Sequence, residues 1–105
     1  MLGPLEREVL AVMNSLGEGT IREIYEEMRK NKKIAYTTVS TTLERLFDKG
    51  YLSRTSMTGR GGTKHVYSLK KVKRKLARMF VNEFTSIFGK GGVSALHAEL
   101  ERLEK

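Results

Sequence analysis

A run of short hydroxyl side chains near the middle of the sequence is the strongest chemical signal. Four of the five residues from 37 to 41 carry a hydroxyl, namely Thr37, Thr38, Ser40 and Thr41. Residues of this type form helix poorly, and a solvated helix face usually carries long Glu and Lys side chains instead. Short hydroxyls let a helix backbone come close to DNA and bond to phosphates or base edges. We predict that these four residues contact DNA; the alternative is a polar helix face without a ligand.

A helix over about 35–49 must hold these hydroxyls on one face. At 100° per residue, the opposite face collects the residues that we expect to be buried, namely Ala35, Tyr36, Val39, Thr42, Leu43 and Leu46. Arg45 lies at the flank of the polar face, where it either reaches a phosphate or pairs with Glu44 or Asp48. Gly50 suits the residue that follows a helix.

Two more helices are predicted upstream. Pro4 suits a first helical turn, and the residues from Gly17 to Gly19 end that first helix. Thr20 and Glu23 form a capping box that opens the second helix. The second helix is followed by a basic turn over 29–33. We expect Lys32 and Lys33, at the end of this turn, to flank a phosphate.

After Gly50 the pattern changes to period two. Segments 51–57 and 63–69 alternate and are rich in β-formers, with a glycine-rich tip over 58–62. Three helices followed by a basic hairpin predict a mainly α fold with a small β-hairpin, a winged helix-turn-helix. In the wing, 57–65, Arg60 and Lys64 are placed to touch the DNA backbone or the minor groove. The alternative is a solvated loop.

Charge is unevenly distributed along the 105 residues. The net charge is +8, but residues 28–80 carry fifteen bases and two acids, whereas both ends are acidic overall. A basic block of this kind is typical of a surface that binds nucleic acid. The alternative is a basic protein with no polyanionic partner.

The last third of the chain predicts two helices around a break at Gly89–Gly92. The first opens with a basic run over 70–75, which is either a second backbone contact or a solvated face. The second has a heptad-like seam. We expect residues 1–69 to be the DNA-binding domain and 70–105 a helical dimerisation region, because its apolar stripe would otherwise be exposed. The alternative is that the helix folds back on its own domain. The expected dimer residues are Leu76, Phe80, Phe84, Ile87, Leu96, Leu100 and Leu103.

Other functional classes lack their residue patterns. There is no Cys, His65 and His97 have no ligand-type neighbours at metal spacing, and no catalytic arrangement appears. We therefore predict no enzyme, no cofactor and no metal. No apolar run is long enough for a membrane span, and the first residues do not form a signal peptide. We expect a cytoplasmic protein that associates with the nucleoid when bound to DNA.

The chain resembles the winged-helix repressors of the penicillinase-repressor type, a group that includes copper-responsive members. The resemblance covers roughly residues 2–69. Its most specific parts are the Ala-Tyr-Thr-Thr-Val run at 35–39, Leu43 with Arg45-Leu46, and Lys-Gly-Tyr-Leu at 49–52. It implies a homodimeric repressor of transcription that reads a palindromic operator on double-stranded DNA.

Some positions depart from the pattern of that family. Asn14 stands where the family usually has Trp, and the wing is longer than usual. The copper-responsive cysteine cluster is missing, and Asn82 is followed by Glu83 where the penicillinase repressors have the Asn-Phe bond at which they are cleaved. The resemblance therefore implies the binding function but no particular inducing signal.

Two other functions remain open from the sequence. The first alternative is an architectural DNA-binding protein with little sequence specificity, and the second is a winged helix used for protein contacts. The ratio of specific to non-specific affinity separates the main hypothesis from the architectural one. The sequence determines neither the operator, nor the regulated genes, nor the signal.

Overall fold

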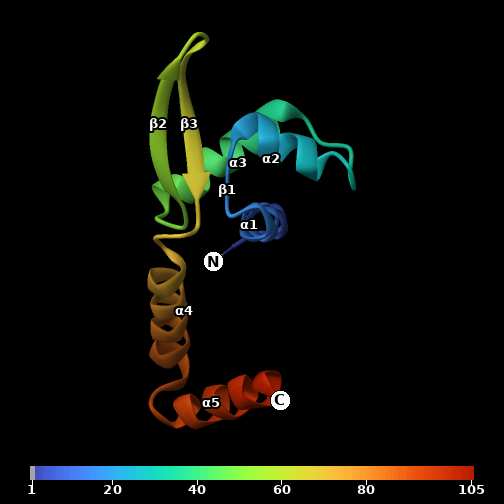
Figure 1. The fold of residues 1–105 in the computed structure, drawn as a ribbon. Helices are drawn as coiled ribbons and strands as arrows, with labels where there is room; N and C mark the ends of the chain where they lie inside the picture. The colour runs from blue at the N-terminus through green and yellow to red at the C-terminus, as the bar shows by residue number, and fades with distance from the viewer. Residues whose placement is uncertain (1) are drawn as a thin grey trace. The chain divides into compact units, whose positions relative to one another are not determined.

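The computed structural model describes residues 2–105, and within this range five helices and three strands follow the order α1, β1, α2, α3, β2, β3, α4, α5 (Figure 1). The fold confirms the predicted mainly α class with a small sheet. Two compact units meet between Lys73 and Arg74, four residues beyond the expected domain boundary. Each unit is described by itself.

The first unit opens with α1 (Pro4–Leu16), β1 (Glu18–Thr20) and α2 (Ile21–Met28). Gly17 ends α1 with a φ of 80°, a conformation that glycine adopts without strain. The predicted capping box of α2 is confirmed: the Glu23 amide donates to the Thr20 hydroxyl, and the Thr20 amide donates to the Glu23 carboxylate.

The segment that was expected only to end α1 also contains a strand. Its central residue Gly19 pairs with Tyr67 in an antiparallel register, and the sheet order is β1-β3-β2. The sequence pattern does not predict β1, because three residues are too few to show an alternation.

The strands β2 (Ser53–Gly59) and β3 (Gly62–Ser68) form the predicted hairpin. The pair Gly59 and Gly62 closes it, so its loop has only two residues, Arg60 and Gly61. The expected five-residue tip is therefore wrong: ladder pairing extends through Thr58 and Thr63. Figure 1 shows the hairpin projecting well beyond the helices of this unit as a long wing.

The core of the first unit lies where α1, α2 and α3 (Tyr36–Asp48) meet the base of the sheet. Side chains from each of these elements are almost fully excluded from solvent, namely Val9, Met13, Ile24, Val39, Leu43, Leu46 and Tyr67. Burying such a side chain contributes roughly 1.5–3 kcal/mol. These residues therefore fix the direction in which α3 presents its other face.

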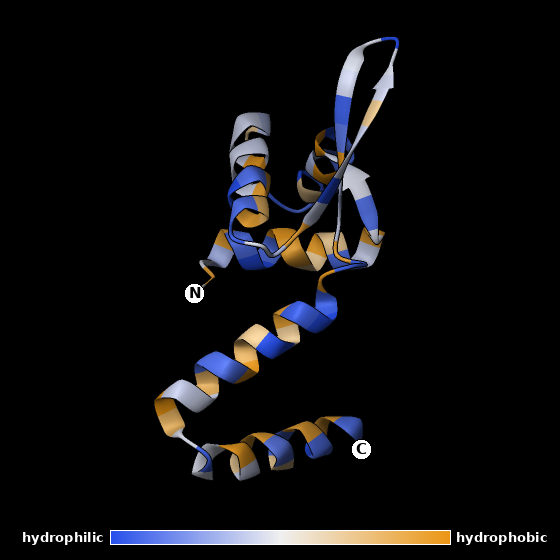
Figure 2. Cartoon of the chain, turned by 90° about the vertical axis from the view of Figure 1, so that its left-hand side faces the viewer, coloured by the Kyte–Doolittle hydropathy of each residue, from blue (hydrophilic) through white to orange (hydrophobic). Residues whose placement is uncertain are grey.

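The second unit contains α4 (Lys73–Phe88) from Arg74 onward, and α5 (Gly91–Glu104). The basic run 70–75 was expected to open α4, but the helix begins only at Lys73. The turn between the helices depends on two glycines. Gly89 has a φ of 66°, and a Cβ on Gly92 would lie 2.7 Å from the Cβ of Phe88. Figure 2 shows the apolar residues of α5 along one side of that helix.

Candidate nucleic-acid interface

The outer face of α3 carries the predicted reading residues. Thr37, Thr38 and Thr41 are exposed, and Ser40 is half-buried. On the inner face, Thr42 is buried and donates its hydroxyl to the backbone carbonyl of Thr38 at 2.7 Å. This bond satisfies the hydroxyl of the one polar side chain that α3 buries. The hydroxyl-bearing residues 37, 38 and 41 lie on the exposed face of the helix.

Two residues expected in the core of α3 are not buried. Ala35 is exposed because the helix begins one residue later and Ala35 serves as its N-cap. Tyr36 is 39% exposed and packs edge-to-face on Tyr25, with ring centroids 5.4 Å apart. Helical periodicity could not show this, because a first-turn residue has no preceding turn to cover it.

The wing presents a second polar surface. Arg60 lies in the two-residue loop, and Lys64 lies on β3 opposite Met57. Both basic side chains are exposed. The hairpin therefore holds two basic side chains beyond the core. A hairpin of this kind can follow a groove of DNA next to the groove that a reading helix occupies.

The structure divides the basic residues of the central block into paired and unpaired groups. Five of them form ion pairs with acids of the first 27 residues, namely Arg29, Lys30, Lys32, Lys49 and Lys70. Among residues 2–105, no ion pair is formed by Lys33, Arg45, Arg60 or Lys64. The acidic N-terminal segment therefore pairs with five of the fifteen basic residues of the block and leaves basic side chains without an ion pair beside α3 and on the wing.

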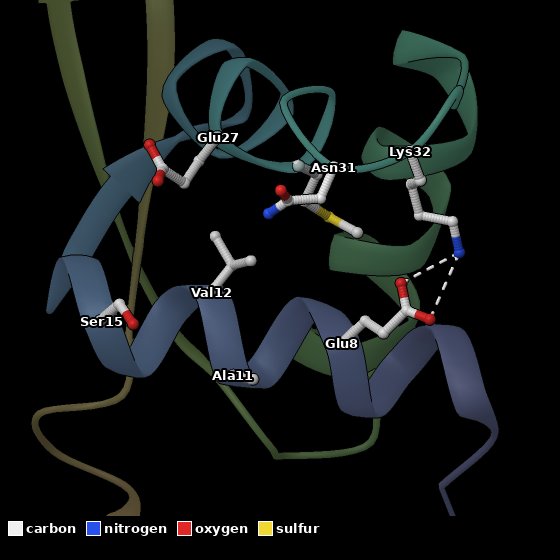
Figure 3. Close-up of a pocket in the computed structure, with 8 residues that line it drawn as sticks. Glu8, Ala11, Val12, Ser15, Glu27, Asn31 and Lys32 are labelled. Atoms are coloured by element: carbon white, nitrogen blue, oxygen red, sulfur yellow. Dashed lines mark hydrogen bonds and ion pairs between the residues drawn. The ribbon is translucent and has the colours of Figure 1, made fainter.

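Lys32 is a predicted phosphate contact that the structure shows in an ion pair. Its ammonium lies 3.0 Å from a carboxylate oxygen of Glu8 on α1. This pair closes one end of a hollow of about 490 Å³ between α1 and α2 (Figure 3). A phosphate would have to compete with Glu8 for Lys32, whereas Lys33 has no such competitor in the described chain. Arg45 pairs with neither Glu44 nor Asp48, so that alternative is not what the structure shows.

Two supporting residues had no signal in the sequence patterns. Glu6 is buried on α1, accepts from the Gly3 amide at 3.0 Å and pairs with Lys49 at 2.9 Å. The Gly3 hydrogen bond first, and then Lys49, hold the pKa of the Glu6 carboxyl below its usual range. This pair ties α1 to the end of α3.

Arg54 is the other supporting residue. Its guanidinium stacks 3.9 Å from the ring centroid of Phe47, so it braces the base of the wing against α3. This contact gives Arg54 a structural role at the junction of the wing and α3. An alternating strand pattern gives no indication of which basic residue takes such a structural role.

A family comparison agrees with this geometry. The family model described as "Penicillinase repressor" matches residues 2–104. The chain belongs to that family. The family consists of DNA-binding transcriptional repressors and not of enzymes. No curated protein matches the chain.

Residues 2–105 contain no group of three or more His, Cys, Asp or Glu side chains that could hold a metal ion. The His65 ring lies 3.2 Å from the Ser56 hydroxyl, and His97 lies 3.0 Å from Glu101. No helix among these residues has the length and apolarity to cross a membrane.

The second unit of this repressor exposes most of the predicted dimer residues. Ile87 is 66% exposed and Leu103 is 76% exposed, while Phe80 and Leu100 are close to half exposed. Phe84 and Leu96 are half-buried. Leu76 is already buried within the single chain, which leaves it little surface to offer a partner.

Proposed function

We propose that the protein is a homodimeric repressor that binds a palindromic operator. In this proposal α3 enters the major groove and its outer hydroxyls, Thr37, Thr38, Ser40 and Thr41, contact base edges and phosphates. The observation that carries it is the exposure of three of these hydroxyls on a helix whose other face buries Val39, Leu43 and Leu46.

The wing and the unpaired bases supply backbone contacts in this proposal. Arg60 and Lys64 approach the minor groove or its phosphates, and Lys33 and Arg45 flank the reading helix. Because these cations form no ion pair within residues 2–105, binding would release counterions from DNA and would not first break protein contacts. Lys32 would join them only by leaving Glu8.

The exposed apolar side chains of α4 and α5 support a dimer. The side chains of Ile87, Phe88 and Leu103 are each more than 60% exposed, and all three belong to the second unit. A symmetric partner would bury the same residues of both chains. Two reading helices would then lie about 34 Å apart, one turn of DNA, which suits a palindrome.

Selection of bound fragments from a random DNA pool tests the proposal. A palindromic consensus with half-sites one turn apart is the expected result. A flat result with retained, strongly salt-dependent binding would favour a protein that coats DNA without operator choice. With roughly 6–10 phosphates contacted by a dimer, log K should fall with log salt at about 0.9 per phosphate. Binding without salt dependence would contradict any role on DNA.

A further inference from the structure

A hollow of about 400 Å³ lies between the start of α2, the start of α3 and β3. The polar residues that line it are Thr20, Arg22, Tyr36, Thr63, Lys64 and His65. Every one of them carries a hydrogen-bond donor, and no acidic residue lines the hollow. All of them belong to the first unit, so the second unit has no part in forming it.

The Arg22 side chain is held in place by an aromatic ring at this site. Its guanidinium carbon lies 5.2 Å from the centroid of Tyr36, and Tyr36 in turn rests on Tyr25. Stacking on a ring leaves the N–H groups at the edge of the guanidinium available to an acceptor. Its ion-pair partner in the described chain is Glu26, at 3.6 Å in a solvent-exposed pair, an interaction worth little.

The β3 side of the hollow adds two more donors. Lys64 is exposed and forms no ion pair in the described chain. The Nδ1 atom of His65 lies 3.2 Å from the Ser56 hydroxyl, which can donate to it. In the tautomer in which Ser56 donates to Nδ1, Nε2 carries the ring proton and is a donor for an acceptor in the hollow.

We propose that this hollow seats one phosphate of the DNA backbone, with Arg22 and His65 as its ligands and the exposed Lys64 ammonium nearby on β3. The inference rests on the proposed function. The hollow adjoins Thr37 of the reading helix through Tyr36, and it adjoins the wing through β3. A duplex that touches both surfaces must carry a strand of backbone between them. Planar guanidinium groups and ammonium groups are the side chains that proteins use most for phosphate.

Arg22→Gln tests this seat, with Arg7→Gln as a matched control. Arg7 is exposed on α1, forms no ion pair within residues 2–105, and removing it costs the same unit of charge. The side chain of Arg22 is 69% exposed, so its replacement should not disturb the fold. We expect Arg22→Gln to weaken binding about tenfold for each half-site, as for loss of a charged hydrogen bond, and therefore about a hundredfold for a dimer, on operator and random DNA alike. Arg7→Gln should bind like the wild type.

A scan of the operator with neutral methylphosphonates locates the contact. In the wild type, one position in each half-site should lose about tenfold in affinity when its phosphate charge is removed. Arg22→Gln should show no further loss at that same position. If Arg22→Gln keeps the full sensitivity of the wild type at every position, or matches Arg7→Gln on unmodified DNA, the seat is wrong.

Titration with inorganic phosphate at constant ionic strength separates the two possible sources of the anion. Shifts of the Arg22, Tyr36 and His65 amide resonances with phosphate but not chloride support the chemistry of the seat. Saturable phosphate binding together with a flat methylphosphonate scan would overturn the assignment to DNA. If only the seat is wrong, the wild type still selects a palindromic operator and binds it with the expected salt dependence, whereas failure of the proposed function removes the operator preference or DNA binding altogether.

Discussion

The two units of the chain differ in whether their apolar side chains are buried or exposed. Eleven of the twelve buried hydrophobic residues in the described chain lie before Arg74, whereas seven of the ten large exposed ones lie after it. The first unit covers its own core and exposes hydroxyls and bases. The second exposes Ile87, Phe88 and Leu103 to solvent. A surface of hydroxyls and bases suits a polyanion, and a surface of exposed aliphatic and aromatic side chains suits another apolar surface.

This difference predicts that a change in one unit leaves the task of the other intact. Variants of the second unit should alter assembly, and variants of the first should alter folding or DNA recognition. Matched pairs of variants, one in a buried or interface position and one in an exposed position, test this separation.

Ile87→Asp should abolish the dimer. The side chain is 66% exposed in the single chain, so its removal costs the monomer little, but symmetry places two charges in the proposed seam. Loss of two buried Ile side chains amounts to roughly 3–6 kcal/mol, or at least a hundredfold in dimer affinity. Sedimentation at micromolar concentration measures the change.

Asn82→Asp is the matched control for Ile87→Asp. It adds the same charge to α4 at an exposed polar position. It should remain a dimer. Phe84→Asp is a less clean probe because Phe84 also packs on Phe88, with centroids 4.9 Å apart, and so supports the turn of its own chain. A wild type that is monomeric at these concentrations and still protects a full palindrome would remove the dimer from the proposal.

Leu43→Ala should destabilise the first unit by about 2–5 kcal/mol, as expected when a fully buried Leu leaves a cavity. Leu103→Ala, at a residue that is 76% exposed, should leave the unfolding of a monomeric Ile87→Asp background almost unchanged. Urea unfolding in that background compares the two. Equal losses at both positions would show that the second unit also has a core within the single chain.

Glu6→Gln should destabilise the fold by about 1–2 kcal/mol at neutral pH, since a charged hydrogen bond to the half-exposed Lys49 is removed. The pKa of Glu6 is lowered in the folded protein from a reference of 4.5. Its stabilising contribution is therefore complete above about pH 4.5 and disappears as pH falls through the lower folded value. The difference in unfolding free energy between wild type and Glu6→Gln should shrink below that pH.

A constant difference between the wild type and Glu6→Gln from about pH 7 down to about pH 3 would mean that the carboxylate charge is not what stabilises the contact. In that case the lost stability would come from a contact that does not depend on the charge of Glu6, and not from the Gly3 hydrogen bond, since a Gln side chain can still accept from that amide. Lys49→Gln then provides an independent check, because it removes the partner and leaves Glu6 in place.

Thr41→Ala should relax base preference by roughly 1–3 kcal/mol at one position of each half-site, if its hydroxyl contacts a base edge. Arg60→Ala should weaken binding to all sequences alike and lower the salt slope by about 0.9 for each phosphate that the protein no longer neutralises. Competition between operator and random DNA at several salt concentrations distinguishes the two. Identical behaviour of both variants would show that α3 and the wing do not have separate roles.

Local patterns predicted most of the elements in the first unit. The capping box of α2 and the alternating hairpin depend on contacts between near neighbours in sequence, so spacing alone reveals them. Predictions failed where an element was too short or lay at an end. The strand β1 has three residues, and Tyr36 begins its helix and lies against Tyr25 instead of entering the core.

The sequence predicted which types of residue form the candidate surface, but not which side chains these residues contact in the folded chain. The sequence identifies a basic block and a hydroxyl-rich helix, and the family comparison agrees with the class of ligand. It does not show that Lys32 is held by Glu8 or that Arg54 stacks on Phe47. These contacts join residues on different elements, and a net charge counts a paired base and an unpaired base alike.

The sequence by itself determined the order of the helices and the hairpin, the basic centre and the apolar stripe of the last third, because periodicity and composition are local properties. Only the tertiary structure decided which charges remain for a ligand and where three elements meet around Arg22. Glu6 illustrates the reason: its burial, its bond to Lys49 and its lowered pKa all arise from packing α1 against the end of α3. Interactions between residues distant in sequence exist only once the chain has folded.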